Sequence, residues 1–95
     1  MRILWSNEAL ADLARLSAFL EPVAPDTALR VVERLTSAPD RLSDFPRLGE
    51  KLDDYAPREV RRLRVDAYEM RYEITSDAIF IVRVWHHREE RSSAP

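Results

Sequence analysis

The residues best suited to chemistry stand together near the end of the chain. Residues 79–88 read IFIVRVWHHR, an apolar run followed by Trp85, His86, His87 and Arg88. Histidine has an unperturbed pKa close to neutrality, so either histidine can serve as a general base. Adjacent strand residues point to opposite faces, so the two rings are not expected to share a metal ion. Because a zinc site needs further ligands and the chain has no other histidine and no cysteine, we predict neither metal nor cofactor.

Arginine is the second chemical feature of the C-terminal half. Residues 58–95 contain eight basic side chains, and all eight are arginine. The planar guanidinium donates paired hydrogen bonds to carboxylate or phosphate, so clustered arginines favour binding of an anionic partner. Cross-strand pairing with Glu69 and Glu73 on a solvated sheet face is the alternative interpretation. We predict a target-binding surface formed by Arg62, Arg64, Arg71, Arg83, Trp85, His87 and Arg88.

Composition limits the class of protein. The chain has 95 residues, of which 45% are hydrophobic and 34% charged, which predicts one globular domain over residues 1–95. The net charge of -2 argues against a general polyanion binder, and the absence of cysteine excludes disulfides and thiolate chemistry. No apolar run approaches the roughly 18 residues of a membrane span. Since the N-terminus also lacks the pattern of a signal peptide, we expect a cytoplasmic protein.

Apolar residues at three- and four-residue spacing predict two helices after a short strand at residues 2–5. The first helix covers residues 7–20, and Ser6 is suited to be its N-cap. The second helix runs from residue 25 to about 38, with a further turn through Leu42. The connection between them is short, so we expect the two helices to pack as an antiparallel hairpin.

Alternating residues predict three strands in the second half, at 59–65, 68–74 and 79–86, after a turn-rich segment at 46–57. Short connections make these strands an antiparallel meander. The order β-α-α-β-β-β indicates an α+β fold with the helix hairpin on one sheet face. The residues expected to face the helices are Leu63, Val65, Met70, Tyr72, Ile74, Phe80, Val82 and Val84. The opposite face is expected to carry Arg62, Arg64, Glu69, Arg71, Glu73, Ile81, Arg83, Trp85 and His87.

Four segments, in this order and spacing, resemble one protein family over nearly the whole chain. They read LWSNEALADLARLSAFL, LSDFPRLGEKL, REVRRLRVDAYEMRYEI and IVRVWHHRE, with Pro25 and Ala28 between the first two. In these features the chain resembles the RelE/ParE superfamily of type II toxin–antitoxin toxins, and the ParE branch most closely. The resemblance implies the RelE/ParE fold, a bacterial growth-inhibiting toxin and neutralisation by a cognate ParD-like antitoxin.

The resemblance implies two possible targets. ParE-type members inhibit DNA gyrase, whereas RelE-type members are ribosome-dependent messenger RNA endonucleases. Both share one fold, so the fold does not choose between them. The C-terminal end HHREERSSAP has no tyrosine, and the segment GEKLDD is net acidic, which suits ribosomal RNA poorly. We therefore favour gyrase as the target and a binding surface without catalytic residues.

The ribonuclease alternative makes specific demands on the side chains. RNA cleavage needs activation of a 2′-hydroxyl, stabilisation of the phosphorane charge and protonation of the leaving oxygen. Arginine suits the second task, and histidine, glutamate or lysine suits the proton transfers. The residues that would carry this chemistry are Arg64, Arg71, Arg83, Glu50, Lys51, His86 and His87.

The apolar side chains of the two helices exceed what one small sheet face must cover. An amphipathic helix of the antitoxin would cover the remainder, a common mode of peptide recognition. Ordinary core packing is the alternative for any one of these residues. The antitoxin-binding residues expected on this basis are Leu10, Leu13, Leu16, Phe19, Leu20, Leu29, Val32 and Leu35.

Overall fold

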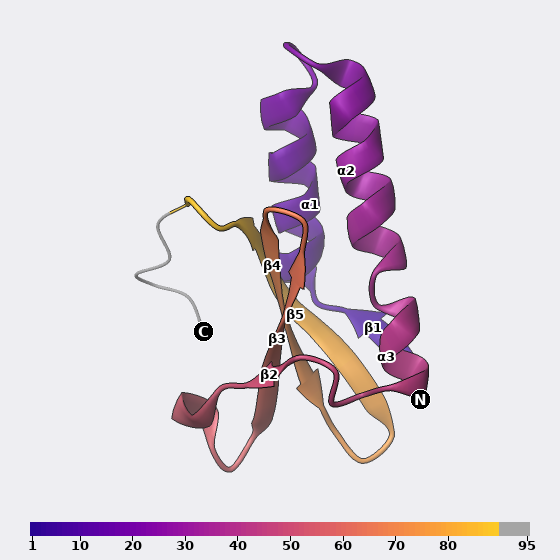
Figure 1. Cartoon of the computed structure of the whole chain (residues 1–95), viewed down its shortest axis with the longest axis vertical. Helices are drawn as coiled ribbons and strands as arrows, with labels where there is room; N and C mark the ends of the chain where they lie inside the picture. The colour runs from indigo at the N-terminus through magenta and orange to yellow at the C-terminus, as the bar shows by residue number, and fades with distance from the viewer. Residues whose placement is uncertain (90–95) are drawn as a thin grey trace.

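A computed structural model describes residues 1–89 and shows two helices packed on a mixed five-stranded sheet (Figure 1). The predicted order β-α-α-β-β-β is confirmed, and a short strand and a 3-10 turn are added within the segment expected to be a loop. The elements are β1 (Arg2–Trp5), α1 (Asn7–Leu20), α2 (Pro25–Ser37), α3 (Asp40–Asp44), β2 (Glu50–Lys51), η1 (Asp53–Tyr55), β3 (Glu59–Val65), β4 (Tyr68–Ile74) and β5 (Ala78–His86).

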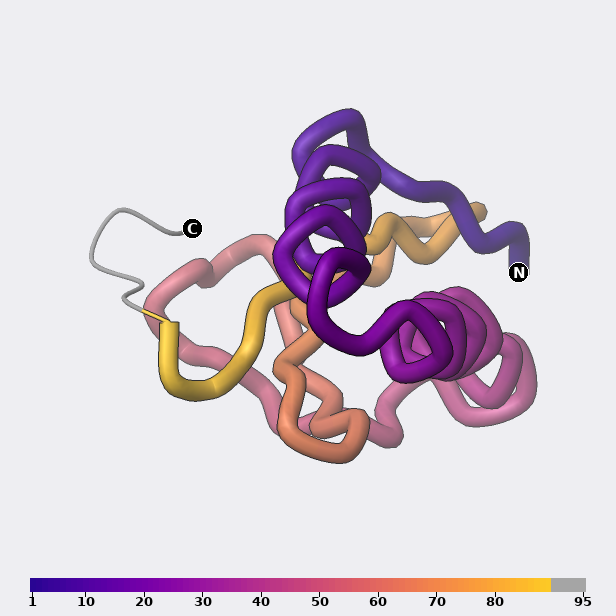
Figure 2. The backbone as a smooth tube through the Cα atoms, turned by 90° about the horizontal axis from the view of Figure 1, so that it is seen from above, coloured from indigo at the N-terminus to yellow at the C-terminus, as the bar shows by residue number. Residues whose placement is uncertain are grey.

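The helices begin and end where their local sequence predicts. The Ser6 hydroxyl accepts the Ala9 N–H at 3.0 Å, which caps α1. Pro25 occupies the first turn of α2, where its missing N–H costs nothing. Pro39 lies between α2 and α3, because proline interrupts the hydrogen bonds of a helix interior. Figures 1 and 2 show α1 and α2 side by side as an antiparallel pair whose far end projects beyond the sheet.

The strand order is β1-β5-β4-β3-β2. The antiparallel meander of β3, β4 and β5 is confirmed by its continuous pairing. β1 pairs in parallel with only the first half of β5, from Arg2 opposite Ala78 to Trp5 opposite Ile81. Beyond Ile81, no strand formed by residues 1–89 lies on the outer side of β5. Within residues 1–89, no helix has the length and apolar character needed to cross a bilayer.

A bulge in β5 interrupts the alternation of its side chains. Met70 lies opposite Val84, but Tyr72 lies opposite Ile81, so Val82 is an extra residue between the two pairs. An extra residue in one strand exchanges the faces of all residues on one side of it. The two halves of β5 consequently follow different alternation patterns.

The predicted faces of three β5 residues are wrong because of this bulge. Ile81 enters the core and is 0% exposed, although it was expected on the opposite face. Phe80 and Val82 are half-buried outside the core cluster, although both were expected to face the helices. The predicted inward positions that the structure confirms, fully or partly buried, are Leu63, Val65, Met70, Tyr72, Ile74 and Val84.

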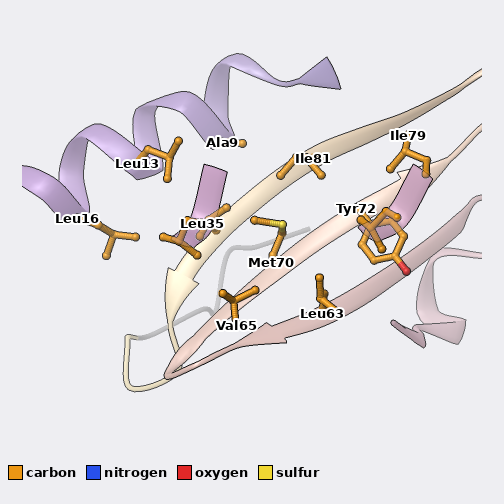
Figure 3. Close-up of a cluster of buried hydrophobic side chains, with 12 residues drawn as sticks. Ala9, Leu13, Leu16, Leu35, Leu63, Val65, Met70, Tyr72, Ile79 and Ile81 are labelled. Atoms are coloured by element: carbon orange, nitrogen blue, oxygen red, sulfur yellow. The ribbon is translucent and has the colours of Figure 1, made fainter. Parts of the chain in front are cut away.

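The core lies between the helix hairpin and the sheet, as the side chains in Figure 3 show. Tyr72 is fully buried there, and its hydroxyl accepts the Gly49 N–H at 2.8 Å and donates to the Pro46 carbonyl at 2.7 Å. A Cβ atom at Gly49 would lie 2.5 Å from the Arg62 carbonyl oxygen. The Tyr72 hydroxyl therefore fixes the segment that leads into β2. The close packing of this segment against β3 is possible because Gly49 has no side chain.

We predict that Tyr72→Phe lowers the free energy of unfolding by roughly 1–3 kcal/mol, because two backbone groups lose their buried partner. Urea denaturation measures this change. Tyr68→Phe is the matched control, since no hydrogen bond of the Tyr68 hydroxyl occurs within residues 1–89. Equal losses in the two variants would contradict the role assigned to the Tyr72 hydroxyl.

Candidate functional site

Three of the predicted arginines stand in register on the sheet face turned away from the core, which we call the far face. Arg62 of β3 lies opposite Arg71 of β4, and Arg71 lies opposite Arg83 of β5. Like charges directly opposite one another destabilise a sheet unless counter-charges separate them. The arrangement of this arginine row therefore depends on the acidic residues around it.

Carboxylates lie at one end and in the middle of the arginine row. Glu50 of β2 forms an ion pair with Arg62, with 2.7 Å between its carboxylate oxygen and the guanidinium nitrogen. Glu69 of β4 is 2% exposed and lies 3.2 Å from the Arg71 guanidinium and 3.9 Å from that of Arg62. A buried carboxylate is stable only when charged or polar groups surround it. Glu69 consequently holds two adjacent arginines in place from within the sheet.

Asp12 of α1 closes the other end of the row. Its two carboxylate oxygens accept hydrogen bonds from Arg83 at 2.9 and 3.2 Å, the paired geometry typical of arginine and carboxylate. The same carboxylate accepts the Val84 N–H at 2.8 Å and a weaker bond from Arg15 at 3.3 Å. Burial acts to raise the pKa of Asp12, but the hydrogen bonds from Arg83, Val84 and Arg15 outweigh it and lower the pKa.

These contacts cover the part of β5 that no strand accompanies. The Ser6 hydroxyl donates to the Val82 carbonyl at 3.0 Å, and its backbone N–H donates to the Ile81 carbonyl at 2.9 Å. The Asp12 carboxylate then accepts a hydrogen bond from the Val84 N–H, the next backbone donor on this side of β5. Uncovered strand edges promote association with other strands, and covering them with a helix is a common remedy. The start of α1 thus takes the place of a neighbouring strand.

Aromatic rings hold the middle of the arginine row. Trp85 is 3% exposed, and the Arg71 and Arg83 guanidinium carbons lie 4.8 and 5.7 Å from its ring centre. The Tyr55 hydroxyl of η1 accepts a hydrogen bond from Arg71 at 2.6 Å. The prediction of Trp85 as an outer contact ring is therefore wrong, because the guanidinium groups cover it. Its aromatic face instead supports two arginines through cation–π contacts.

The predicted surface residues that reach solvent lie at the rim of the far face. Arg64, His87 and Arg88 are exposed, and Arg64 and Arg88 have no ion-pair partner within residues 1–89. Arg62 is partly exposed beside Glu50. The structure therefore divides the predicted target-binding residues into an inner group held by other side chains and an outer group available for contact. Residues from Glu90 onward, which form the end of the segment HHREERSSAP, lie outside the described part of the chain.

The sequence predicted that the two histidines point to opposite faces, and the structure shows that they do not. Their rings stack with centres 4.6 Å apart, because β5 ends at His86 and the chain turns at His87. His86 also meets the edge of Tyr68, opposite it on β4, at 5.2 Å. Burial first, then the charges of His87 and Arg88, lowers the pKa of His86. Across residues 1–89, no cluster of three or more potential metal-binding His, Cys, Asp or Glu side chains is found.

The two ribonuclease residues predicted in β2 lie apart from the histidines. Glu50 pairs with Arg62, and Lys51 is exposed beside Arg61 on the outer side of β3. His86 lies at the other side of the meander, opposite Tyr68, whose neighbours on that face belong to the core. The structure therefore places Arg71 and Arg83 in the row and Arg64 at its rim. Of the proposed proton-transfer groups only Glu50 reaches the row, where it is paired with Arg62.

Sequence reasoning missed two residues that bind the arginine row. Asp12 sits on the apolar side of α1 between Ala9 and Leu13, and a carboxylate inside such a stripe is the signal that would have marked it. Tyr55 was treated as part of a loop, and nothing local indicates that η1 brings its hydroxyl to Arg71. Both contacts join residues that are distant in the sequence.

The predicted antitoxin-binding residues fall into buried and exposed groups. Leu13, Leu16 and Leu35 belong to the core, with exposed fractions of 9%, 5% and 0%, so ordinary packing accounts for them. Leu20 and Val32 are half-buried. The exposed members are Leu10 at 50%, Phe19 at 79% and Leu29 at 62%.

Comparisons with known proteins agree with this architecture. The model of a family described as the ParE toxin of type II toxin–antitoxin system, parDE, matches residues 3–91. Toxin RelE2 of Caulobacter vibrioides is 32% identical over 85 residues, covering 90% of this chain and 93% of that protein. Toxin RelE1 of the same organism is 28% identical over 89 residues, covering 94% and 96%.

A solved structure shares the fold. A chain described as part of a chromosomal ParDE TA system from P. aeruginosa superimposes with a TM-score of 0.76. The alignment covers 90% of this chain and 95% of that one, at 21% sequence identity. At this level of identity the similarity shows a common fold.

We predict that Asp12→Asn lowers the free energy of unfolding at pH 7 by roughly 1–3 kcal/mol, because Arg83 loses its charged partner. Folding lowers the pKa of Asp12, so its contribution is complete above the unfolded value of about 3.9. That contribution is lost as the pH falls through the lower folded pKa.

Urea denaturation at pH 7 and at pH 2.5 tests the role of Asp12. The difference between wild type and Asp12→Asn should be largest at pH 7 and shrink in acid. Glu33→Gln, on the exposed side of α2, serves as the control and should show little effect at either pH. A difference that stays constant from pH 7 to pH 2.5 would contradict the charged role of Asp12.

Proposed function

The chain belongs to the ParE toxin family of type II toxin–antitoxin systems, and on this premise we propose that it inhibits growth by binding DNA gyrase. The proposed contact surface is the rim of the far face. Gyrase is the target of ParE-type toxins, and inhibition by binding needs a complementary surface without a proton-transfer set. A cognate ParD-like antitoxin is the proposed neutralising partner.

The observation that carries this proposal is that each arginine of the row is already bound to neighbouring side chains of the protein. Arginine assists phosphoryl chemistry when its N–H groups face the charge that develops in the transition state. Here Asp12 engages Arg83, Glu50 engages Arg62, and Arg71 is shared between Tyr55 and Glu69. A row of guanidiniums already bound to fixed partners supports a rigid recognition surface better than a catalytic centre.

The exposed rim is where a target would make contact. Arg64 and Arg88 are exposed and have no ion-pair partner among residues 1–89, and His87 presents a ring beside Arg88. A recess of about 300 Å³ lies between Glu8, Tyr55 and Arg83, beside the Val82 bulge. Charged rims accelerate association and select partners more than they raise affinity. The inner arginines and Trp85 then act as positioning residues for the outer ones.

A ribonuclease activity is the second candidate, and one contact favours it. The Tyr55 hydroxyl lies 2.6 Å from an Arg71 nitrogen on the far face, where arginine is close enough to assist proton transfer from the phenol. Toxins named RelE are also among the relatives. The two candidates differ in substrate, so purified components distinguish them directly.

The antitoxin is proposed to cover the exposed apolar side chains of the helix hairpin. Leu10, Phe19 and Leu29 reach solvent, whereas the buried leucines of the same stripes are excluded because removing them from the core would unfold the domain. Co-expression with the reading frame adjacent to the toxin gene, followed by purification, identifies the antitoxin. The two products are expected to co-purify and growth is expected to recover.

We predict that the double variant Arg64→Glu, Arg88→Glu relieves growth inhibition and that roughly tenfold more protein is needed to inhibit gyrase supercoiling, because charge reversal opposes target contact. Arg30→Glu on α2 is the matched control, since Arg30 is exposed, donates a hydrogen bond to Thr27 of its own helix and has no ion-pair partner within residues 1–89. Arg83 and Trp85 are unsuitable for this test because both are built into the fold.

Purified protein is assayed for gyrase supercoiling and for messenger RNA cleavage on ribosomes. Inhibition of supercoiling without cleavage supports the gyrase proposal. Cleavage that depends on Tyr55, with supercoiling unaffected, would instead establish the ribonuclease. Full activity of the folded double variant in both assays would exclude the rim as the target surface.

A further inference from the structure

A second surface lies between α1 and the open end of the β4–β5 hairpin, and it adjoins the arginine row through Arg15, which bonds the Asp12 carboxylate that also binds Arg83. It is a groove of about 640 Å³. Leu16, Phe19 and Leu20 of α1 form one wall, and Tyr68 and His86 form the other. The helix pair projects beyond the sheet at this end (Figure 1).

Phe19 is the prominent apolar side chain of the groove. It is 79% exposed, and Val23, in the connection after α1, is 88% exposed. Single exposed apolar residues are ordinary, but a phenylalanine beside a hollow lined by leucine and tyrosine forms a continuous apolar surface. Aromatic side chains in such positions are typical anchors of protein interfaces. The groove therefore has the form of a receptor for an apolar side chain.

The rim of the groove is cationic and contains one carboxylate of the chain itself. Arg15 pairs with Glu89 across the mouth of the groove. Another oxygen of Glu89 accepts the His86 N–H at 2.7 Å. Arg88 has no ion-pair partner within residues 1–89. Arg15 also bonds Asp12 at 3.3 Å, outside the groove lining. At the rim itself two arginines face one carboxylate, Glu89, which occupies the position that an external carboxylate would take.

We propose that this groove binds an acidic amphipathic segment of the antitoxin, whose carboxylate replaces Glu89 on Arg15 while its apolar side chain packs against Phe19. The inference rests on the proposed function and names the partner's chemistry at one site. A second copy of this chain fits less well, because two cationic rims would then meet. An acidic segment complements the excess of arginine.

The exchange of carboxylates has a predictable energetic balance. The Arg15 side chain is 44% exposed, so replacing Glu89 by another carboxylate changes its solvation little. The ion pair then contributes selectivity for an acidic segment, and burial of Phe19 contributes most of the affinity. Glu89 acts as an internal competitor, and removing its charge should tighten binding.

The first test measures the affinity of the purified antitoxin, identified by co-expression, for Phe19→Ser by isothermal titration calorimetry. We expect binding roughly tenfold weaker or more, as for loss of an anchor residue. Phe45→Ser is the matched control, because Phe45 is also an exposed phenylalanine, at 64%, and lies outside the groove. Its affinity should equal that of the wild type.

The second test uses Glu89→Gln, which keeps an oxygen for the His86 N–H but removes the negative charge. We expect several-fold tighter binding than for the wild type. Glu21→Gln, an exposed glutamate at the end of α1, is the control and should leave the affinity unchanged. Urea denaturation of each variant verifies that it is folded.

The outcomes separate this inference from the proposed function. If Phe19→Ser and Phe45→Ser bind the antitoxin equally, the groove is not its site, although the toxin–antitoxin assignment stands. If Glu89→Gln binds no more tightly than the wild type, the exchange of carboxylates is wrong. If the wild type does not bind the antitoxin, this inference and the proposed neutralisation by the antitoxin both fail. Self-association of the free toxin that Phe19→Ser abolishes would assign the groove to a second copy and overturn the proposed occupant.

Discussion

The carboxylate of Asp12 at the uncovered edge of β5 is the contact on which the arrangement of both layers depends. β1 accompanies β5 only as far as Ile81, so the following backbone groups need partners from elsewhere. Ser6 and Asp12 supply them from the start of α1 and thereby attach the helix to the sheet. Because the same carboxylate binds Arg83, the closure of a strand edge also orders the far face.

The far face is consequently a set of charges that largely compensate one another. Each arginine of the row has a carboxylate beside it, and Trp85 supports two of the guanidiniums from beneath. Such a face carries little net charge at its centre, and among residues 1–89 its arginines without an ion-pair partner, Arg64 and Arg88, lie at its rim. In the proposed function this arrangement favours recognition of a target over catalysis, and Arg88 borders both the rim of the far face and the groove beside α1. A toxin of this family needs both an inhibitory surface and a surface for neutralisation.

Prediction from the sequence was accurate wherever a local pattern determined the outcome. Ser6 capped α1 and the meander strands took their expected ranges, because capping and alternation depend on residues close in sequence. Alternation failed at Val82, since a bulge leaves no clear mark in composition. It failed again after His86, where the strand ends. Trp85 was taken for an exposed ring because alternation places Arg71 and Arg83 on its face but does not show that their guanidiniums lie over the ring.

The sequence by itself determined the order of helices and strands, the family and the presence of an arginine-rich sheet face. These follow from periodicity and from residue types, which are properties of short segments. Only the tertiary structure decided which arginines are engaged and which are exposed, because their partners Asp12, Glu50 and Tyr55 come from other elements. It likewise decided that Phe19 borders a groove whereas Leu13 fills the core, since one helical stripe contains both and only packing distinguishes them.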